Sequence, residues 1–297
     1  MAEIVILGSG SGFATSERFC TSIAVLAGEG FYLFDCGEPV GPLLFRAGID
    51  PLALRTLFIS HMHPDHVGGL ATLLFAVYLP GRSGARKFKP WSINRNDDWY
   101  RNALSFPQRV EGAIEESRGQ IKIIMPGEAI KPIQSYLTAV YLAPELLPFD
   151  LELEAVREGK TYDDGLLRVF STPNRHLKSN FAYERLAQSQ PKLKLESYSY
   201  RGEIEGTSFV FSGDIQTLEE LEPLIGENLE LLIVEVAHFE PATIHNFVTR
   251  HGIRRTILTH IHPGLEKRIA ELVAEWNDPR IEIAHDGLRI ALGSAEV

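Results

Sequence analysis

The residue types best able to do chemistry gather in one short segment, His61-Met62-His63-Pro64-Asp65-His66. Three imidazoles and a carboxylate so close together are typical ligands of divalent metal ions. The apolar run at residues 57–60 precedes them and predicts a buried strand, and an apolar helical stretch follows from Leu70. A strand that ends in such a loop directs several ligands at one point, which predicts a site for two divalent cations. The alternative is a polar loop with surface histidines.

Three further residues of suitable type follow other predicted strands. His176 comes after the apolar run at residues 167–171, Asp214 after residues 208–211 and a Ser-Gly turn, and His260 after residues 256–259. Each of them alone is also consistent with an ordinary loop residue. Together they predict that one rim of the sheets holds seven ligands.

Composition limits the class of protein. The chain has 297 residues, of which 44% are hydrophobic and 23% charged, as in a soluble globular protein. Its apolar stretches are too short to span a bilayer, and its start does not resemble a signal peptide, so we expect no membrane association. The two cysteines predict a reducing, cytoplasmic location. The net charge of −10 argues against a general nucleic-acid-binding surface.

The chain alternates strands and helices in two similar halves, which predicts two sheets packed face to face with helices outside. The pair Ser22–Ala27 and Phe31–Gly37 is expected to form a hairpin. Expected strands also include residues 3–7, 166–171, 208–212, 231–236 and 256–259, and expected helices are residues 40–47, 218–224, 243–251 and 265–276.

The motifs resemble those of the metallo-β-lactamase superfamily, and most of all its ribonuclease Z-like branch. The similar elements are His-x-His-x-Asp-His, a later His, Asp in Ser-Gly-Asp and His in Leu-Thr-His. Leu33–Glu38, His176–Tyr183 and Ile283–Leu288 are similar to an opening strand and turn, a His-Ser-Tyr stretch and a closing strand of that branch. The resemblance runs from residue 5 to about residue 292, apart from one basic segment.

This resemblance implies an α/β fold, a four-layer αββα sandwich formed as a single domain over residues 1–297. It implies two metal ions with a bridging hydroxide as the nucleophile. Zinc suits the ligands best, and manganese or iron are alternatives. In the ligand set that it implies, the first ion is bound by His61, His63 and His176, the second by Asp65, His66 and His260, and Asp214 bridges the two.

The resemblance also suggests residues that assist catalysis. Asp65 is expected to orient the nucleophile or take its proton, and His238 to hydrogen-bond the scissile phosphate. A helix-capping role is the alternative for His238. Glu235 is the expected carboxylate that orients a histidine, with Asp35 and Ser60 as rival candidates for that role.

A segment at about residues 80–120 differs from the rest of the chain. Between Pro80 and Val110 it carries seven basic residues against two acidic ones, with aromatic residues interleaved. Such a mixture can stack bases and pair with phosphates, which favours an anionic substrate. The alternatives are a homodimer interface or a solvated surface segment.

Only 37 residues separate His176 from Asp214, and they include residues 181–186 and 208–212, which are predicted strands. No room remains for the protruding arm of tRNA-processing relatives, so tRNA 3′ processing is disfavoured. We therefore expect a cytoplasmic metal-dependent phosphodiesterase for small phosphodiesters or other anionic substrates, with short RNA as a further option. The alternatives are a lactone, ester or thioester hydrolase of the same fold and a binding protein without activity.

Overall fold

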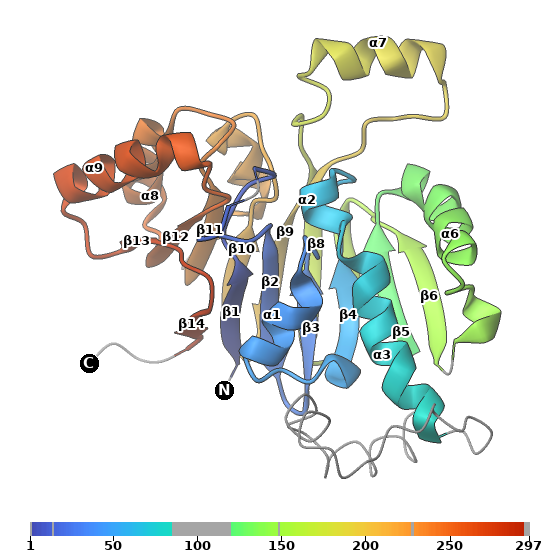
Figure 1. Ribbon diagram of the computed structural model, residues 1–297. Coiled ribbons are helices and arrows are strands. Elements are labelled where there is room, and N and C mark those ends of the chain that lie inside the picture. The colour runs from blue at the N-terminus through green and yellow to red at the C-terminus, as the bar shows by residue number, and fades with distance from the viewer. Residues whose placement is uncertain (1, 14, 85–119, 148, 227–228, 294–297) are drawn as a thin grey trace.

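The computed structural model describes residues 2–13, 15–84, 120–147, 149–226 and 229–293. Two seven-stranded sheets face each other, and helices cover their outer sides (Figure 1). This arrangement confirms the predicted four-layer αββα sandwich.

The first sheet combines an antiparallel and a parallel half. The antiparallel half contains the predicted hairpin, in which Ile23 pairs with Phe34, and the parallel half begins where the chain crosses from β3 to β4. Across the sheet the strands are β14 (Leu288–Ala291), β1 (Glu3–Gly8), β2 (Ser22–Ala27), β3 (Gly30–Phe34), β4 (Leu54–Phe58), β5 (Gln120–Met125) and β6 (Asp150–Ala155).

The second sheet repeats this plan, with one antiparallel and one parallel half that meet at β10. Across the sheet the strands are β13 (Ile281–Ile283), β12 (Arg255–Thr259), β11 (Leu231–Glu235), β10 (Thr207–Phe211), β9 (Tyr198–Ile204), β8 (Leu167–Pro173) and β7 (Gly159–Asp163). The matching plan of the two sheets explains why the sequence shows two similar halves.

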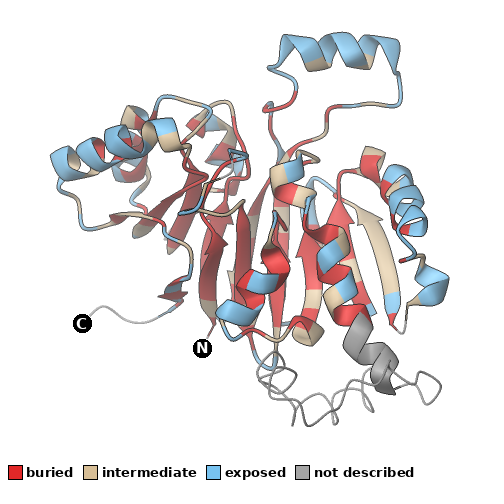
Figure 2. Ribbon diagram, viewed as in Figure 1, coloured by how far each residue is buried: buried red, intermediate tan, exposed pale blue. Residues whose placement is uncertain are grey.

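Three apolar layers hold the sandwich together (Figure 2). The central layer lies between the sheets, where Phe34 contacts Phe58, Tyr200, Phe209 and Phe211. The outer layers lie under helices. Those on the first sheet are α1 (Val40–Arg46), α3 (Leu70–Gly84) and α6 (Ile130–Ala139), and those on the second are α8 (Ile244–His251), α9 (Glu266–Trp276) and the 3₁₀ helix at Leu218–Leu224.

Two predictions of local structure were wrong. Residues 181–186, predicted as a strand, belong to helix α7 (Phe181–Ser189), whose start Asn180 caps by accepting a hydrogen bond from the Ala182 N–H. No strand lies beside this segment, so local helix formation is unopposed. Ile283–Leu288, taken as one closing strand, instead forms the turn between β13 and β14, which lie in different sheets.

The absence of an arm was also a wrong expectation. Helix α7 stands away from both sheets, above the rim where β8 ends, and its residues are largely exposed (Figures 1 and 2). The arm, defined here as residues 177–197, therefore does lie between His176 and Asp214, although it is short.

Most of the basic, aromatic segment predicted at about residues 80–120 lies outside the described residues. The substrate-binding and interface roles suggested for this segment therefore stay predictions. The single-domain assignment stays a prediction. Within the described ranges, every helix falls short of the length and apolar character needed to cross a membrane.

Replacing Phe34 with Ala should lower the free energy of unfolding by about 3–5 kcal/mol, because the fully buried ring leaves a cavity between the sheets. Urea denaturation measures the change. Phe181→Ala is the matched control, since its ring is 71% exposed, and should change stability by less than about 0.5 kcal/mol. Equal losses in the two variants would contradict this account of the core.

Candidate metal centre

The direction of the strands brings the predicted ligands to one rim. Strands β4, β8, β10 and β12 all end at the same edge of the sandwich, the upper edge in Figure 1. The segment His61–His66 follows β4 in the first sheet and includes the short helix α2 (Pro64–Val67). His176, Asp214 and His260 follow strands of the second sheet. Both sheets therefore contribute to one cluster.

The cluster contains two sets of close ligand atoms. His61, His63, His176 and Asp214 form the first set, with their ligand atoms within 4.8 Å of one another. A second set of the same compactness contains Asp65, His66 and His260.

Asp214 connects the two sets. Its Oδ1 lies 3.3 Å from His66 Nε2, and its Oδ2 lies 3.4 Å from His260 Nε2, 3.6 Å from His176 Nε2 and 3.7 Å from His61 Nε2. The structure thus brings all seven predicted ligands together.

A buried carboxylate behind the cluster fixes two of the imidazoles. Asp35 Oδ2 lies 2.6 Å from His66 Nδ1 and also accepts the Ser60 hydroxyl at 2.7 Å. Ser60 Oγ in turn lies 3.0 Å from His61 Nδ1. Both rings therefore present Nε2 to the centre. Metal-binding histidines commonly have such an outer hydrogen-bond partner, so the rival candidates Asp35 and Ser60 occupy that position.

Two other histidines have outer partners that the sequence did not indicate. Thr21 Oγ1 lies 2.8 Å from His260 Nδ1, and Tyr183 Oη lies 3.2 Å from His63 Nε2. His63 consequently faces the centre with Nδ1, which is 3.3 Å from His176 Nε2. Thr21 and Tyr183 lie far from their partners in sequence. Tyr183 ends the His-Ser-Tyr stretch, but that pattern does not indicate its contact with His63, so only the folded chain reveals these contacts.

Unpartnered buried atoms test whether metal ions fit this cluster. His61 Nε2, His66 Nε2 and Asp214 Oδ1 are buried without a hydrogen-bond partner among the described residues. Buried polar atoms are normally satisfied, so three that converge on one point favour a cation there. Imidazole and carboxylate donors in this number fit divalent metal ions.

The electrostatics of the cluster agree with this role. Burial lowers the pKa of His61 well below its ordinary value and that of His176 to about 3, which keeps these two rings neutral as ligands must be. Burial acts in the same direction on His66, but Asp214 and Asp35 outweigh it and raise the pKa of His66 well above its ordinary value, so a metal ion would have to displace that proton. Burial alone would raise the pKa of Asp214, but the surrounding imidazoles, His260 and His66 above all, hold it well below its usual range.

Asp65 is packed against the glycine-rich turn at residues 8–12. A Cβ atom on Gly12 would lie 3.0 Å from Asp65 Oδ2, so a side chain there would have to displace this carboxylate slightly. The same Oδ2 is 3.6 Å from His66 Nε2 and 3.8 Å from His260 Nε2. Asp65 thus lies on the side of the second set.

His238 lies at the same rim, and Glu235 holds it. The two Glu235 oxygens are 3.1 and 3.2 Å from His238 Nδ1, and the carboxylate also accepts the N–H groups of Ile215, Ala237 and His238. Glu235 therefore orients His238 rather than a member of the two ligand sets. Burial opposes the charge on the imidazole, but Glu235 outweighs it and raises the pKa of His238 to about 9.

His238 also forms a third compact group, with Asp214 and His260. Its Nδ1 lies 3.6 Å from Asp214 Oδ2, but 35% of its side chain is exposed, unlike the buried ligands. The geometry suits a group that faces a substrate.

Known proteins are similar to this chain over nearly its whole length. The family model described as "Anti-Pycsar protein Apyc1" matches residues 2–88. Ribonuclease BN of Erwinia tasmaniensis is 26% identical, over 96% of this chain and 98% of its own. Ribonuclease Z of Methanococcus maripaludis is 23% identical, over 98% of this chain and 99% of its own.

Solved structures share the fold. The metallo-β-lactamase fold protein YhfI from Bacillus subtilis superposes with a TM-score of 0.68 at 17% identity, with 97% of this chain and 98% of that one covered. The short form of human tRNase Z gives 0.66 at 17% identity, with 98% and 99% covered. The present chain is thus similar in sequence to ribonucleases Z and BN and has the metallo-β-lactamase fold.

Two further histidines lie outside the two ligand sets. His245 lies 3.4 Å from Asp278 and stacks on Trp276. His262 accepts the Gly264 N–H in the turn after β12.

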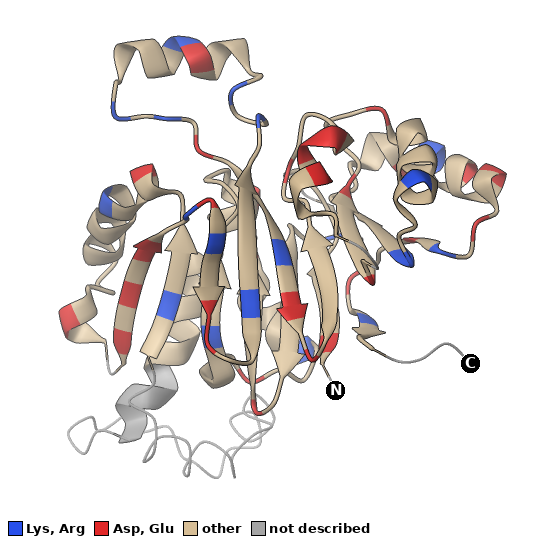
Figure 3. Cartoon of the chain, turned by 180° about the vertical axis from the view of Figure 1, so that it is seen from behind, with Lys and Arg blue, Asp and Glu red and all other residues tan. Residues whose placement is uncertain are grey.

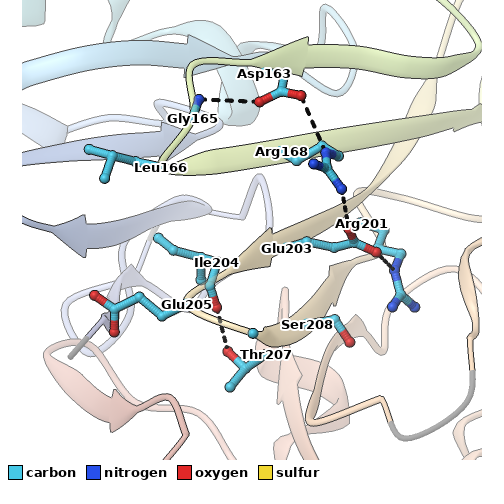
Figure 4. A pocket seen from close by; sticks show the side chains of 11 residues that line it. Asp163, Gly165, Leu166, Arg168, Arg201, Glu203, Ile204, Glu205, Thr207 and Ser208 are labelled. Atoms are coloured by element: carbon cyan, nitrogen blue, oxygen red, sulfur yellow. Dashed lines mark hydrogen bonds and ion pairs between the residues drawn. The ribbon is translucent and has the colours of Figure 1, made fainter.

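The cavity drawn in Figure 4 is separate from the candidate metal centre. It has a volume of about 560 Å³ and lies at the opposite ends of the strands, beside the turns β7–β8 and β9–β10. Arg168 pairs there with Asp163 and Glu203, and Arg201 pairs with Glu203. Lys and Arg alternate with Asp and Glu on the strands seen from behind (Figure 3). The charges of this cavity are thus paired with one another.

Asp35→Asn should weaken metal binding about 10- to 100-fold, because the ring of His66 loses its charged outer partner. Asparagine is the chosen replacement because it tolerates the φ of 56° at this position. Competition with a fluorescent zinc chelator measures the affinity. Asp150→Asn, at the exposed start of β6, is the control and should bind metal like the wild type. Equal affinity in the two variants would contradict the role of Asp35.

Proposed function

We propose that the protein is a phosphodiesterase with two divalent metal ions, most suitably zinc. The observation that carries this proposal is the buried carboxylate of Asp214 between two sets of ligands, with His238 exposed beside it. His61, His63 and His176 would hold the first ion, Asp65, His66 and His260 the second, and Asp214 both. When bound, such a pair activates water as a nucleophile near neutral pH and neutralises charge on the phosphate.

Asp65 and His238 are the residues expected to transfer protons. Asp65, held by Gly12 at the edge of the second set, is placed to orient the attacking water and accept its proton. His238 is placed to donate a proton to the leaving oxygen. Its Nδ1 faces the Glu235 carboxylate, which stabilises the protonated ring. A positioned histidine of this kind contributes about 10²–10⁴-fold to a proton-transfer step.

Relatives and charge support a phosphodiester as the substrate. The two ribonucleases named above match this chain along nearly its full length. A diphosphatase of the PhnP family and yeast PDE1 share the fold, with TM-scores of 0.59 and 0.61. The arm carries four basic and two acidic side chains in a chain whose net charge is −10, which favours an anionic ligand near the rim.

The size of the substrate follows from the arm. Helix α7 extends over only nine residues and lies above the rim, so the accessible space suits small phosphodiesters or the end of a short RNA. Both are anionic substrates of the kind expected from the sequence. We also propose that the protein is cytoplasmic and forms a homodimer.

Purified protein with added zinc or manganese should hydrolyse bis(p-nitrophenyl) phosphate, and Asp65→Ala should abolish most of this activity because the water loses its orienting carboxylate. The release of p-nitrophenolate measures the rate. Metal-replete protein that cleaves p-nitrophenyl esters or lactones but no diester would contradict the proposal and favour the carbon-ester alternative.

His238→Gln should reduce kcat about 10²–10⁴-fold for a diester with an alkoxide leaving group, and much less for bis(p-nitrophenyl) phosphate. The reason is that p-nitrophenolate departs without a proton, whereas an alkoxide needs one. Comparing kcat for the two substrates separates acid catalysis from a general defect. His245→Gln is the control and should match the wild type on both. Equal losses on both substrates would show that His238 is not the acid.

A further inference from the structure

Helix α7 contacts the metal centre through the side chain of Tyr183. No residue of α7 is buried, and Phe181 and Leu186 on it are 71% and 44% exposed. Tyr183 is partly buried, and its hydroxyl lies 3.2 Å from His63 Nε2, with the two rings 5.6 Å apart. This contact lies on the side of α7 that faces the rim.

Both ends of the arm are held by the body of the protein. At its base the Asn174 N–H donates to the Ser197 carbonyl at 2.9 Å. The returning segment is held by Glu128, whose carboxylate accepts the N–H groups of Lys194, Leu195 and Glu196. These contacts fix the ends of the arm, and the contact of Tyr183 with His63 joins α7 itself to the rim.

His63 differs from the other metal ligands in the origin of its outer partner. Ser60, Asp35 and Thr21, which hold the outer nitrogens of His61, His66 and His260, all belong to the first sheet or the loops at its rim. The outer partner of His63 comes instead from an exposed helix between β8 and β9. One ligand of the first ion therefore depends on the position of the arm.

We propose that Tyr183 is a positioning residue that couples α7 to the first metal ion. The proposal rests on the ligand set given above. Coordination by His63 Nδ1 leaves the ring proton on Nε2, which then donates to Tyr183 Oη. A bound cation would withdraw electron density from the ring and make this N–H a stronger donor than that of the free imidazole, so the contact is weaker without metal. Metal binding thus strengthens the contact between α7 and the rim, and by linkage this contact strengthens metal binding equally.

This coupling affects the choice of substrate. A ligand that leaves the contact between Tyr183 and His63 intact binds to a fully supported first ion. A bulky ligand that displaces α7 removes the outer partner of His63 and weakens the centre that must cleave it. The coupling therefore selects small phosphodiesters over large folded ones.

Hydrogen exchange of the arm, with and without zinc, tests the coupling without relying on activity. In the wild type, zinc should slow amide exchange in residues 177–197. Tyr183→Phe should abolish this slowing and weaken the affinity for one ion about 10-fold, the low end of the effect of losing an outer partner. Tyr141→Phe is the control, because its side chain is 80% exposed in a turn outside the rim, and should behave like the wild type.

The possible results separate this inference from the proposed ligand set. Equal slowing by zinc in the wild type and Tyr183→Phe, at equal affinity, would overturn the coupling and leave the ligand set standing. Failure of the wild type to bind zinc, manganese or iron would overturn the ligand set and the coupling with it. Slowing of exchange by zinc in the wild type, but not in Tyr183→Phe, supports both the ligand set and the coupling.

Discussion

The burial of Asp214 is the constraint on which the rest of the centre depends. Its side chain is only 2% exposed, and imidazole nitrogens surround it at hydrogen-bond distance or slightly beyond. A buried carboxylate is unfavourable unless positive charge compensates it. Burial keeps His61 neutral, so this ring does not supply that charge. Burial also opposes the charge on His66, but Asp214 and Asp35 outweigh it and raise the pKa of His66 well above its ordinary value. The cluster is therefore a preformed arrangement of donors in which bound cations would take over the compensation of Asp214.

The fold meets this requirement by placing ligands from both sheets at one rim. His61 to His66 come from the first sheet, and His176, Asp214 and His260 come from the second. Their spacing consequently depends on the apolar layer between the sheets, where Phe34 packs on Phe58 and Phe209. The outer hydrogen bonds from Asp35, Ser60 and Thr21 then set the orientation of each ring. The packing of the core therefore sets the distances between the metal ligands.

Much of the fold and the site followed from the sequence, because strand ends and metal ligands leave local signals. The strands before His61, Asp214 and His260 are short apolar runs that end at turn residues, and each ends in the structure where its ligand begins. Gly252, next to α8, has the left-handed conformation that its place in the sequence indicates.

The long-range contacts could not be predicted from the sequence. Residues 181–186 contain aromatic residues that favour a strand as much as a helix, and only the absence of a neighbouring strand decides between the two. The contacts of Thr21 with His260 and of Tyr183 with His63 span 239 and 120 residues, and no local pattern indicates them. The sequence leads us to expect that Glu235 orients a histidine, and the structure places its carboxylate against His238.

The count of bound metal ions tests the central claim of this account most directly. Wild-type protein saturated with zinc and freed of excess metal should contain two ions per chain by elemental analysis, as a centre built around a shared carboxylate requires. Asp214→Asn should retain at most one, because the two ligand sets lose the charge that joins them. A wild type with no bound ion, or a variant that still binds two with unchanged affinity, would contradict the dinuclear centre.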